Sequence, residues 1–233
     1  TAVGYSAGLN FGNGGTAAQN TLIGSRAGQD ITTGDDNVAI GYYAAKHEIG
    51  LSTGSGNVIV GNYSKTNADG GNYQNVIGYN VTGSGNDTTT IGKTTDEITT
   101  SHGSTSWSTV SDSRVKENVT NSATGLAFVN DLRPVTFTFK KKKDLPTWHK
   151  AYSTDETIGE EQIRNNWVNT GFLAQEIKTV IDNHSYVNDE LWGENAVPGT
   201  TEKIQRVAPT ALIPILVKAL QEADDKIDAL TAR

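Results

Sequence analysis

The chain has 233 residues, a formal net charge of -7 and no cysteine. Disulfides, cysteine-ligated metals and cysteine nucleophiles are therefore excluded, and a nucleic-acid partner held by bulk positive charge is not expected. No apolar run is long enough to span a bilayer, so membrane insertion is not expected either. The chain begins with Thr1 and contains no Met, so we expect it to be a piece of a longer protein.

Composition divides the chain in two. Twenty of the 25 glycines precede residue 111, whereas all five prolines follow residue 133. The first 110 residues carry only four Lys or Arg and eight Asp or Glu. Such a shift is typical of a domain boundary, and we predict one domain over 1–110 and a second over 111–233.

The first domain repeats a short aliphatic stretch that ends in glycine. The intervals between these glycines are 20, 17, 20, 17 and 14 residues, and the glycines are Gly4, Gly24, Gly41, Gly61, Gly78 and Gly92. Each unit is expected to form a short strand followed by a polar turn. One unit buries too little to fold alone, so we predict a mainly β domain, a β-solenoid or β-roll in which several chains associate. A disordered glycine-rich segment is the alternative, but disorder does not require aliphatic residues at a constant position.

These units resemble the Asn-x-x-x-Gly-x-x-Ala repeats of trimeric autotransporter heads, which also occur in phage tail fibres. Residues 37–44 match the pattern best, and the resemblance covers about residues 1–93. It implies an elongated, surface-exposed, trimeric fibre.

The second domain has the patterns of an α+β fold. Residues 126–132 have helical spacing and end before Pro134, while Val135 to Phe139 alternate as in a strand. A second helix is expected to open at Gly171. The C-terminal helix carries an a/d seam that steps by 3, 4, 3, 4 and 3 through Ile213, Leu216, Leu220, Ala223, Ile227 and Leu230. We expect a trimeric helix from this seam; an amphipathic helix packed on a single-chain core is the alternative.

Several blocks of this domain resemble the C-terminal intramolecular chaperone of phage tailspikes and tail fibres, the endosialidase-type or peptidase S74 family. The blocks are Ser111-Asp112-x-Arg114-x-Lys116, Asp131 to Val135, Gly171 to Glu176, and the terminal Pro-Ile-Leu-x-Lys-Ala-Leu helix. The resemblance implies a domain that trimerises, assists folding of the preceding β segment and cuts itself off. It also implies that Ser111 is the nucleophile, that Lys116 is the general base, and that the cut falls between Val110 and Ser111.

This chemistry is consistent with the residue types. A serine hydroxyl needs a base, and lysine serves as one when burial or a nearby cation keeps it neutral. Arg114 could supply part of that positive field. Asp112 is expected to be a turn or cap residue, with a triad member as the alternative. Whether Lys116 acts within its own chain or on a partner chain stays open.

The remaining features carry weaker expectations. The four histidines, His47, His102, His149 and His184, lack ligand spacing, so neither a metal nor a cofactor is expected. The run Lys140–Lys143 is expected to be a solvated hairpin or loop, with an anion site as the alternative. Packing between coils is expected for Tyr42, Tyr43, Tyr63 and Tyr79, with a sugar-binding face as the alternative.

The function expected from these patterns is a phage tail fibre or tailspike tip with a self-cleaving chaperone, a single-turnover serine endopeptidase. Its partners would be a homotrimer and a host cell-surface receptor, either polysaccharide or outer-membrane protein. The fibre would reside in the virion, and the chaperone would be released in the host cytoplasm during assembly. An uncleaved trimeric adhesin head with a structural C-terminal cap is the alternative. A glycan-cleaving first domain is disfavoured because no paired carboxylates stand out in the repeats.

Overall fold

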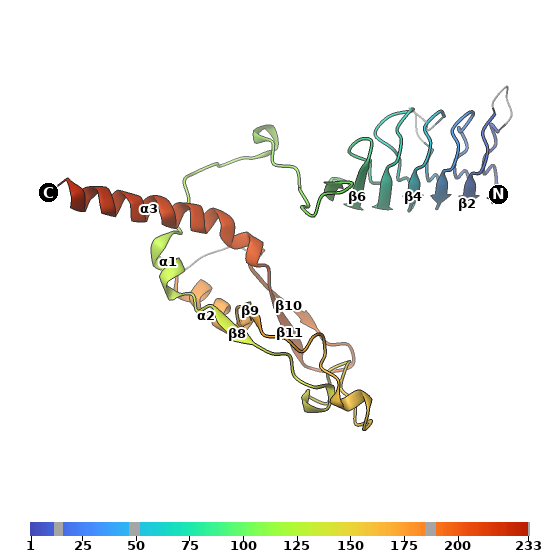
Figure 1. The fold of residues 1–233 in the computed structure, drawn as a ribbon. Helices are drawn as coiled ribbons and strands as arrows, with labels where there is room; N and C mark the ends of the chain where they lie inside the picture. The colour runs from blue at the N-terminus through green and yellow to red at the C-terminus, as the bar shows by residue number, and fades with distance from the viewer. Residues whose placement is uncertain (12–15, 47–51, 185–189, 233) are drawn as a thin grey trace. The chain divides into compact units, whose positions relative to one another are not determined.

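The fold is described from a computed structural model that covers residues 1–11, 16–46, 52–184 and 190–232. The chain divides into two compact units, Thr1–Asn118 and Val119–Arg233 (Figure 1). The division therefore follows Asn118, whereas composition placed it after Val110. Among the described residues, no helix is both long and apolar enough to cross a membrane.

The first unit is a β-solenoid, as expected from the repeats. One short strand comes from each coil, and the strands form a single seven-stranded sheet in sequence order (Figure 1). The first six pair in parallel, whereas β7 pairs antiparallel with β6 and ends the regular repeat. The strands are β1 (Ala2–Val3), β2 (Thr21–Ile23), β3 (Val38–Ile40), β4 (Val58–Val60), β5 (Asn75–Tyr79), β6 (Thr88–Lys93) and β7 (Asp96–Ser101).

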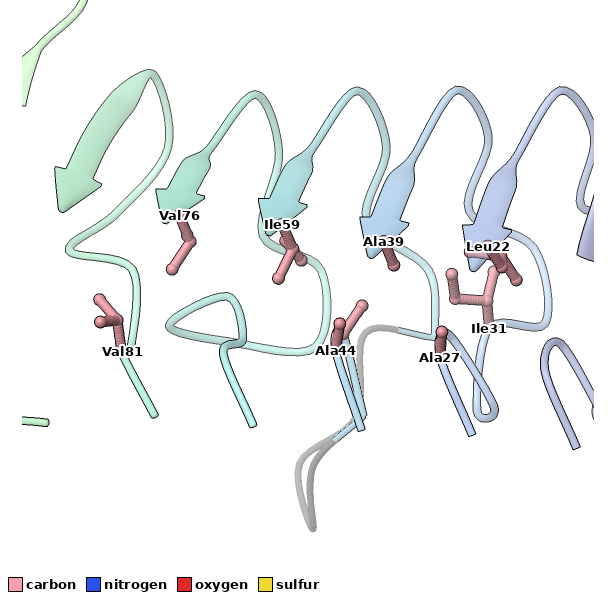
Figure 2. Close-up of a cluster of buried hydrophobic side chains, with 9 residues drawn as sticks. Leu22, Ala27, Ile31, Ala39, Ala44, Ile59, Val76 and Val81 are labelled. Carbon is pink, nitrogen blue, oxygen red and sulfur yellow. The ribbon is translucent and has the colours of Figure 1, made fainter. Parts of the chain in front are cut away.

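The solenoid core is a narrow column of small and aliphatic side chains. The second residues of consecutive strands point inward and stack in register, as Figure 2 shows for Leu22, Ala39, Ile59 and Val76. Residues from the opposite side of each coil close the column, namely Ala27, Ile31, Ala44 and Val81. This alternation explains why only one residue of each aliphatic triplet is fully buried.

The asparagines that directly precede strands β2, β3 and β4 are buried and join neighbouring coils. Asn37 donates from Nδ2 to the Gly54 carbonyl at 2.9 Å, and its Oδ1 accepts from the Asn57 backbone N–H at 3.0 Å. Asn20 and Asn57 make equivalent bonds. A buried amide needs such partners, so the asparagine ladder accounts for the repeated Asn without any ligand.

The glycine of each repeat allows the coils to approach closely. Gly61 has φ = 136°, and a Cβ there would lie 1.6 Å from the Gly78 carbonyl oxygen. Gly24 and Gly41 show the same left-handed conformation and the same contact with the next coil's glycine. Only glycine fits both requirements.

The second unit is α+β. Its helices are α1 (Leu126–Asp131), α2 (Ala174–Asn183) and α3 (Ile213–Thr231); its short 3₁₀ turns are η2 (Lys142–Asp144), η3 (Ile158–Glu160) and η4 (Pro209–Leu212). Two antiparallel pairs join β8 (Val135–Phe137) to β9 (Asn169–Gly171) and β10 (Trp192–Ala196) to β11 (Lys203–Val207).

Two sequence predictions for this unit were wrong in detail. The second helix begins at Ala174, because Gly171 is paired with Val135 as the end of β9. Phe139 lies outside β8, although its ring contacts Phe137 at a centroid distance of 5.3 Å.

Candidate active site

The candidate catalytic residues lie on the chain segment that follows β7. A bridge between Thr99 and Ser108 adds this segment to the edge of the sheet, and Val110 and Ser111 come directly after it. The segment then makes one 3₁₀ turn, η1 (Ser113–Val115).

Asp112 and Arg114 hold that turn. Asp112 is its N-cap and accepts from the Arg114 backbone N–H at 2.8 Å. The Arg114 guanidinium also binds both Asp112 carboxylate oxygens, at 2.9 Å from Nε and 2.6 Å from Nη2. The Arg114 side chain, with the backbone bond second, therefore lowers the pKa of Asp112. Asp112 thus has the expected cap geometry, and Arg114 is paired with it.

The turn brings Ser111 and Lys116 together. The Lys116 Nζ donates to the Ser111 Oγ at 2.7 Å, and the Lys116 backbone N–H donates to the Ser113 carbonyl at 3.2 Å. The 2.7 Å separation is within the range of roughly 2.6–3.2 Å over which a base can take a hydroxyl proton. A short turn is therefore sufficient to make a Ser–Lys pair within one chain.

Solvent reaches the whole of this segment in the single chain. Every residue from 111 to 120 is exposed, including Ser111 and Lys116. A lysine can act as a base where desolvation or a neighbouring cation favours its neutral form. The Arg114 guanidinium is bound to Asp112, so the cation nearest in sequence is already paired with a carboxylate.

The described histidines lie elsewhere. His102 contacts Thr89 and Asn75 in the solenoid, and His149 accepts from the Ala151 backbone N–H. His184 is paired with Asp131 at 2.7 Å. His47 lies outside the described residues. Ser111 is thus hydrogen-bonded to a lysine, and the three described histidines have other partners.

Three lysines of the run Lys140–Lys143 form ion pairs within the chain. Lys141 and Lys143 both bind Glu160, and Lys142 binds Glu161. The bonds from Lys141 and Lys143 lower the pKa of Glu160 to about 2. The expected solvated loop is a 3₁₀ turn, η2, clamped to η3. Glu160 and Glu161 lie 17 or 19 positions after the lysines that they bind, a spacing that played no part in the sequence prediction.

Two blocks singled out in the sequence meet in the fold of the second unit. Arg133 donates from Nε to the Glu176 carboxylate at 3.1 Å, and β8 pairs with β9 between these residues. Both blocks lead into one core, formed by Phe128, Ile177, Val180, Leu191, Leu212 and Ile215.

Helix α3 has two apolar faces. Ile215 and Ala219 are buried against the rest of the unit, whereas the seam residues Leu216 and Leu220 are 42% and 71% exposed. The remaining large seam residues are exposed in the same way, namely Ile213, Ile227 and Leu230. Packing on the single-chain core therefore uses a face different from the a/d seam.

The comparison with protein families agrees with this organisation. Residues 111–186 match the Peptidase_S74 family model, described as the chaperone of endosialidase. Residues 111–186 are therefore similar to an endosialidase-type chaperone and follow a β-solenoid, an arrangement that fits a tail-fibre or endosialidase-type chaperone. The family implies self-cleaving peptidase activity in general and an association with phage fibres. No curated protein and no solved structure matched the chain.

Proposed function

We propose that this chain is the tip of a phage tail fibre or tailspike whose C-terminal domain trimerises, folds the solenoid and then releases itself by cleavage between Val110 and Ser111. The observation that carries the proposal is the 2.7 Å contact between Ser111 Oγ and Lys116 Nζ at the first residues of the Peptidase_S74 match. On this proposal the functional domains are 1–110, the fibre, and 111–233, the chaperone.

The cleavage needs only these two side chains and water. Lys116, once neutral, takes the Ser111 hydroxyl proton while Oγ bonds to the Val110 carbonyl carbon. The C–N bond breaks, the Ser111 nitrogen leaves as an amine with that proton, and Val110 is held as an ester on Oγ. Water then hydrolyses the ester, giving a Val110 carboxylate and restoring the hydroxyl. The Asp112–Arg114 pair keeps the turn in place during both steps.

Trimerisation is supported by exposed apolar residues on both units. On α3 it is the a/d seam described above, which packs three helices when its large side chains meet at an axis. On the solenoid it is the outer stripe, one aliphatic residue per strand in register on the outward face of the sheet: Val3, Ile23, Ile40, Val60, Ile77, Ile91 and Ile98. Such a continuous patch is unusual on a monomer and fits two further copies of this chain.

Assembly then controls cleavage. On this proposal, further chains of the trimer exclude water from residues 111–116. Desolvation makes Lys116 neutral, so the cut follows folding and does not precede it. The fibre goes into the virion and binds a host polysaccharide or outer-membrane protein, and the chaperone is left in the host cytoplasm.

The test is the intact mass of the expressed chain beside that of point variants. Wild type should yield two pieces, and the C-terminal piece should begin at Ser111. Ser111→Ala and Lys116→Ala should remain uncut at 24.8 kDa and still trimerise, because neither change removes core volume. Ser113→Ala is the matched control, since this exposed serine contributes its carbonyl and should still cleave.

Two outcomes would contradict the proposal. A C-terminal piece that starts at another residue would overturn the assignment of Ser111. A wild-type trimer that never cleaves would favour the uncleaved adhesin head with a structural cap.

A further inference from the structure

The solenoid coils share an unusual corner directly after each ladder glycine. The second residue past the glycine has positive φ in every described coil, and its backbone N–H donates to the first residue past the glycine of the preceding coil, as Tyr63 does to Tyr42 at 2.9 Å. The residues in this left-handed position are Ser6, Arg26, Tyr43, Tyr63, Asn80 and Thr94.

Tyrosine is conformationally unfavourable at this corner. Tyr43 has φ = 58° and Tyr63 has φ = 61°, a conformation that asparagine tolerates better than a bulky side chain. The following residues, Ala44 and Ser64, are the ones that enter the core. The two rings therefore do not build the coil interior, and Tyr63 remains 42% exposed. The coil requires the left-handed backbone here but not a bulky side chain. A tyrosine kept in this strained conformation therefore points to a role outside the coil.

The rings form one continuous aromatic surface, which we call the tyrosine cluster: Tyr42, Tyr43, Tyr63 and Tyr79. Tyr43 and Tyr63 are stacked at a centroid distance of 5.5 Å and an interplanar angle of 15°. Tyr42 and Tyr79 meet Tyr63 edge-on at 5.4 and 6.4 Å. Packing between coils, expected from the sequence, thus coexists with half-exposed rings.

Two cations converge on this surface. Arg26 lies over the Tyr43 ring at 5.1 Å and donates to its hydroxyl, and the Lys46 Nζ lies 4.5 Å from the same ring. They are two of only four basic residues in the first 110 positions. Among the residues that the structure describes, neither Arg26 nor Lys46 forms an ion pair with a carboxylate.

We propose that the tyrosine cluster, with Arg26 and Lys46, is a binding site for an acidic polysaccharide of the uronate or sialate class. Sugar C–H faces pack on the exposed rings, phenol hydroxyls bind sugar hydroxyls, and the two cations bind the carboxylates. This inference rests on the proposed fibre function and deepens it, because it names the chemical class of the receptor and the residues that bind it.

The test is affinity electrophoresis of the whole trimer in native gels that contain polygalacturonate, with dextran gels as the neutral comparison. Wild type should be retarded by polygalacturonate only. Tyr63→Asn and Arg26→Ser should weaken binding about fivefold or more, since each removes one contact. Both use residues that the same corner already carries in other coils, Asn80 and Ser6, so the backbone is preserved.

Tyr73→Asn is the matched control. Tyr73 is also a tyrosine with positive φ, 55°, and is 59% exposed, but it precedes β5 and lies away from the corner. It should bind as wild type does. Loss of binding by Tyr73→Asn as well would show a non-specific effect of tyrosine removal and overturn the proposal.

Assembly and cleavage are measured on the same samples. Variants that lose the trimer would show that a neighbouring chain covers the cluster, which overturns the binding site but not the fibre function. Equal retardation of wild type and both variants also overturns it. A wild type that neither trimerises nor cleaves would instead be a failure of the proposed function.

Discussion

Glu222 of α3 accepts a hydrogen bond from the backbone N–H of Leu126 at 2.8 Å, although 96 residues separate them. Leu126 is the first residue of α1, and the N-cap of that helix, Gly125, has no side chain with which to cap it. Glu222 therefore serves as the missing cap and ties α3 to the start of the chaperone fold.

This relationship predicts a pH dependence of the second unit. The bond from Leu126, with Lys218 as a weaker contributor, lowers the pKa of Glu222. A lowered folded pKa means that the carboxylate stabilises the fold above its ordinary pKa and that this contribution is lost as the pH falls through the lowered value. Glu222→Gln should lower the melting temperature at pH 7, and the difference from wild type should shrink as the pH falls below the ordinary carboxyl pKa. Asp225→Asn, exposed on the same helix, should change neither melting curve.

The glycine ladder predicts a severe effect of one methyl group. Gly61→Ala places a Cβ 1.6 Å from the Gly78 oxygen and forces a left-handed alanine, so soluble fibre should not form. Gly85→Ala has open space and should change the free energy of unfolding by less than about 0.5 kcal/mol. Solubility and thermal melting of the two variants check this. Normal folding of Gly61→Ala would contradict the close coil contact.

Lysine at position 116 should be needed for its chemistry and not only for its charge. Lys116→Arg keeps a cation and donors near Ser111 but cannot act as a base, so cleavage should slow at least about 100-fold while the trimer persists. Ser113→Ala, whose exposed side chain lies outside the dyad, should still cleave. Time courses on denaturing gels distinguish the two. Fast cleavage by Lys116→Arg would mean that another group is the base.

The exposed seam of α3 should control assembly. Leu216→Asp and Leu220→Asp place charges at the proposed three-helix axis and should abolish both trimerisation and cleavage. Gln221→Asp adds the same charge at an exposed position outside the seam, and this variant should still trimerise and cleave. Light scattering after size exclusion measures the mass of each variant. Trimers formed by Leu220→Asp would place the chain contacts elsewhere.

Residues 1–110 should depend on the chaperone to fold but not to persist. Short strands specify their register weakly, and three chains must align before the outer stripe is covered. Expressed alone, the segment should be insoluble or monomeric. The same segment released after folding should remain trimeric in denaturant, because its unfolding barrier remains high. Soluble trimers of the lone segment would refute the chaperone role.

Periodicity predicted the solenoid, because one constraint acts at every coil. Asn37, Gly41 and Ala44 recur in their neighbours since each must bond, approach or fill the same place in the stack. The antiparallel β7 lacks that pattern, and nothing in its sequence distinguishes a closing strand from another coil. The start of α2 was misplaced for a similar reason, since Gly171 is fixed by its pairing with Val135 and not by helix propensity.

Sequence by itself determined the repeat and the difference in composition between the two halves, because both patterns are local. Ser111 and Lys116 were predicted through the family resemblance, and their catalytic roles stay a proposal. Tertiary structure alone decided that Glu222 caps α1, that the lysine run is clamped by Glu160 and Glu161, and that the four tyrosines meet as one surface. These contacts join residues that are far apart in the chain or are brought together by the stacking of coils. Their geometry depends on the tertiary packing of the chain, which local sequence patterns do not predict.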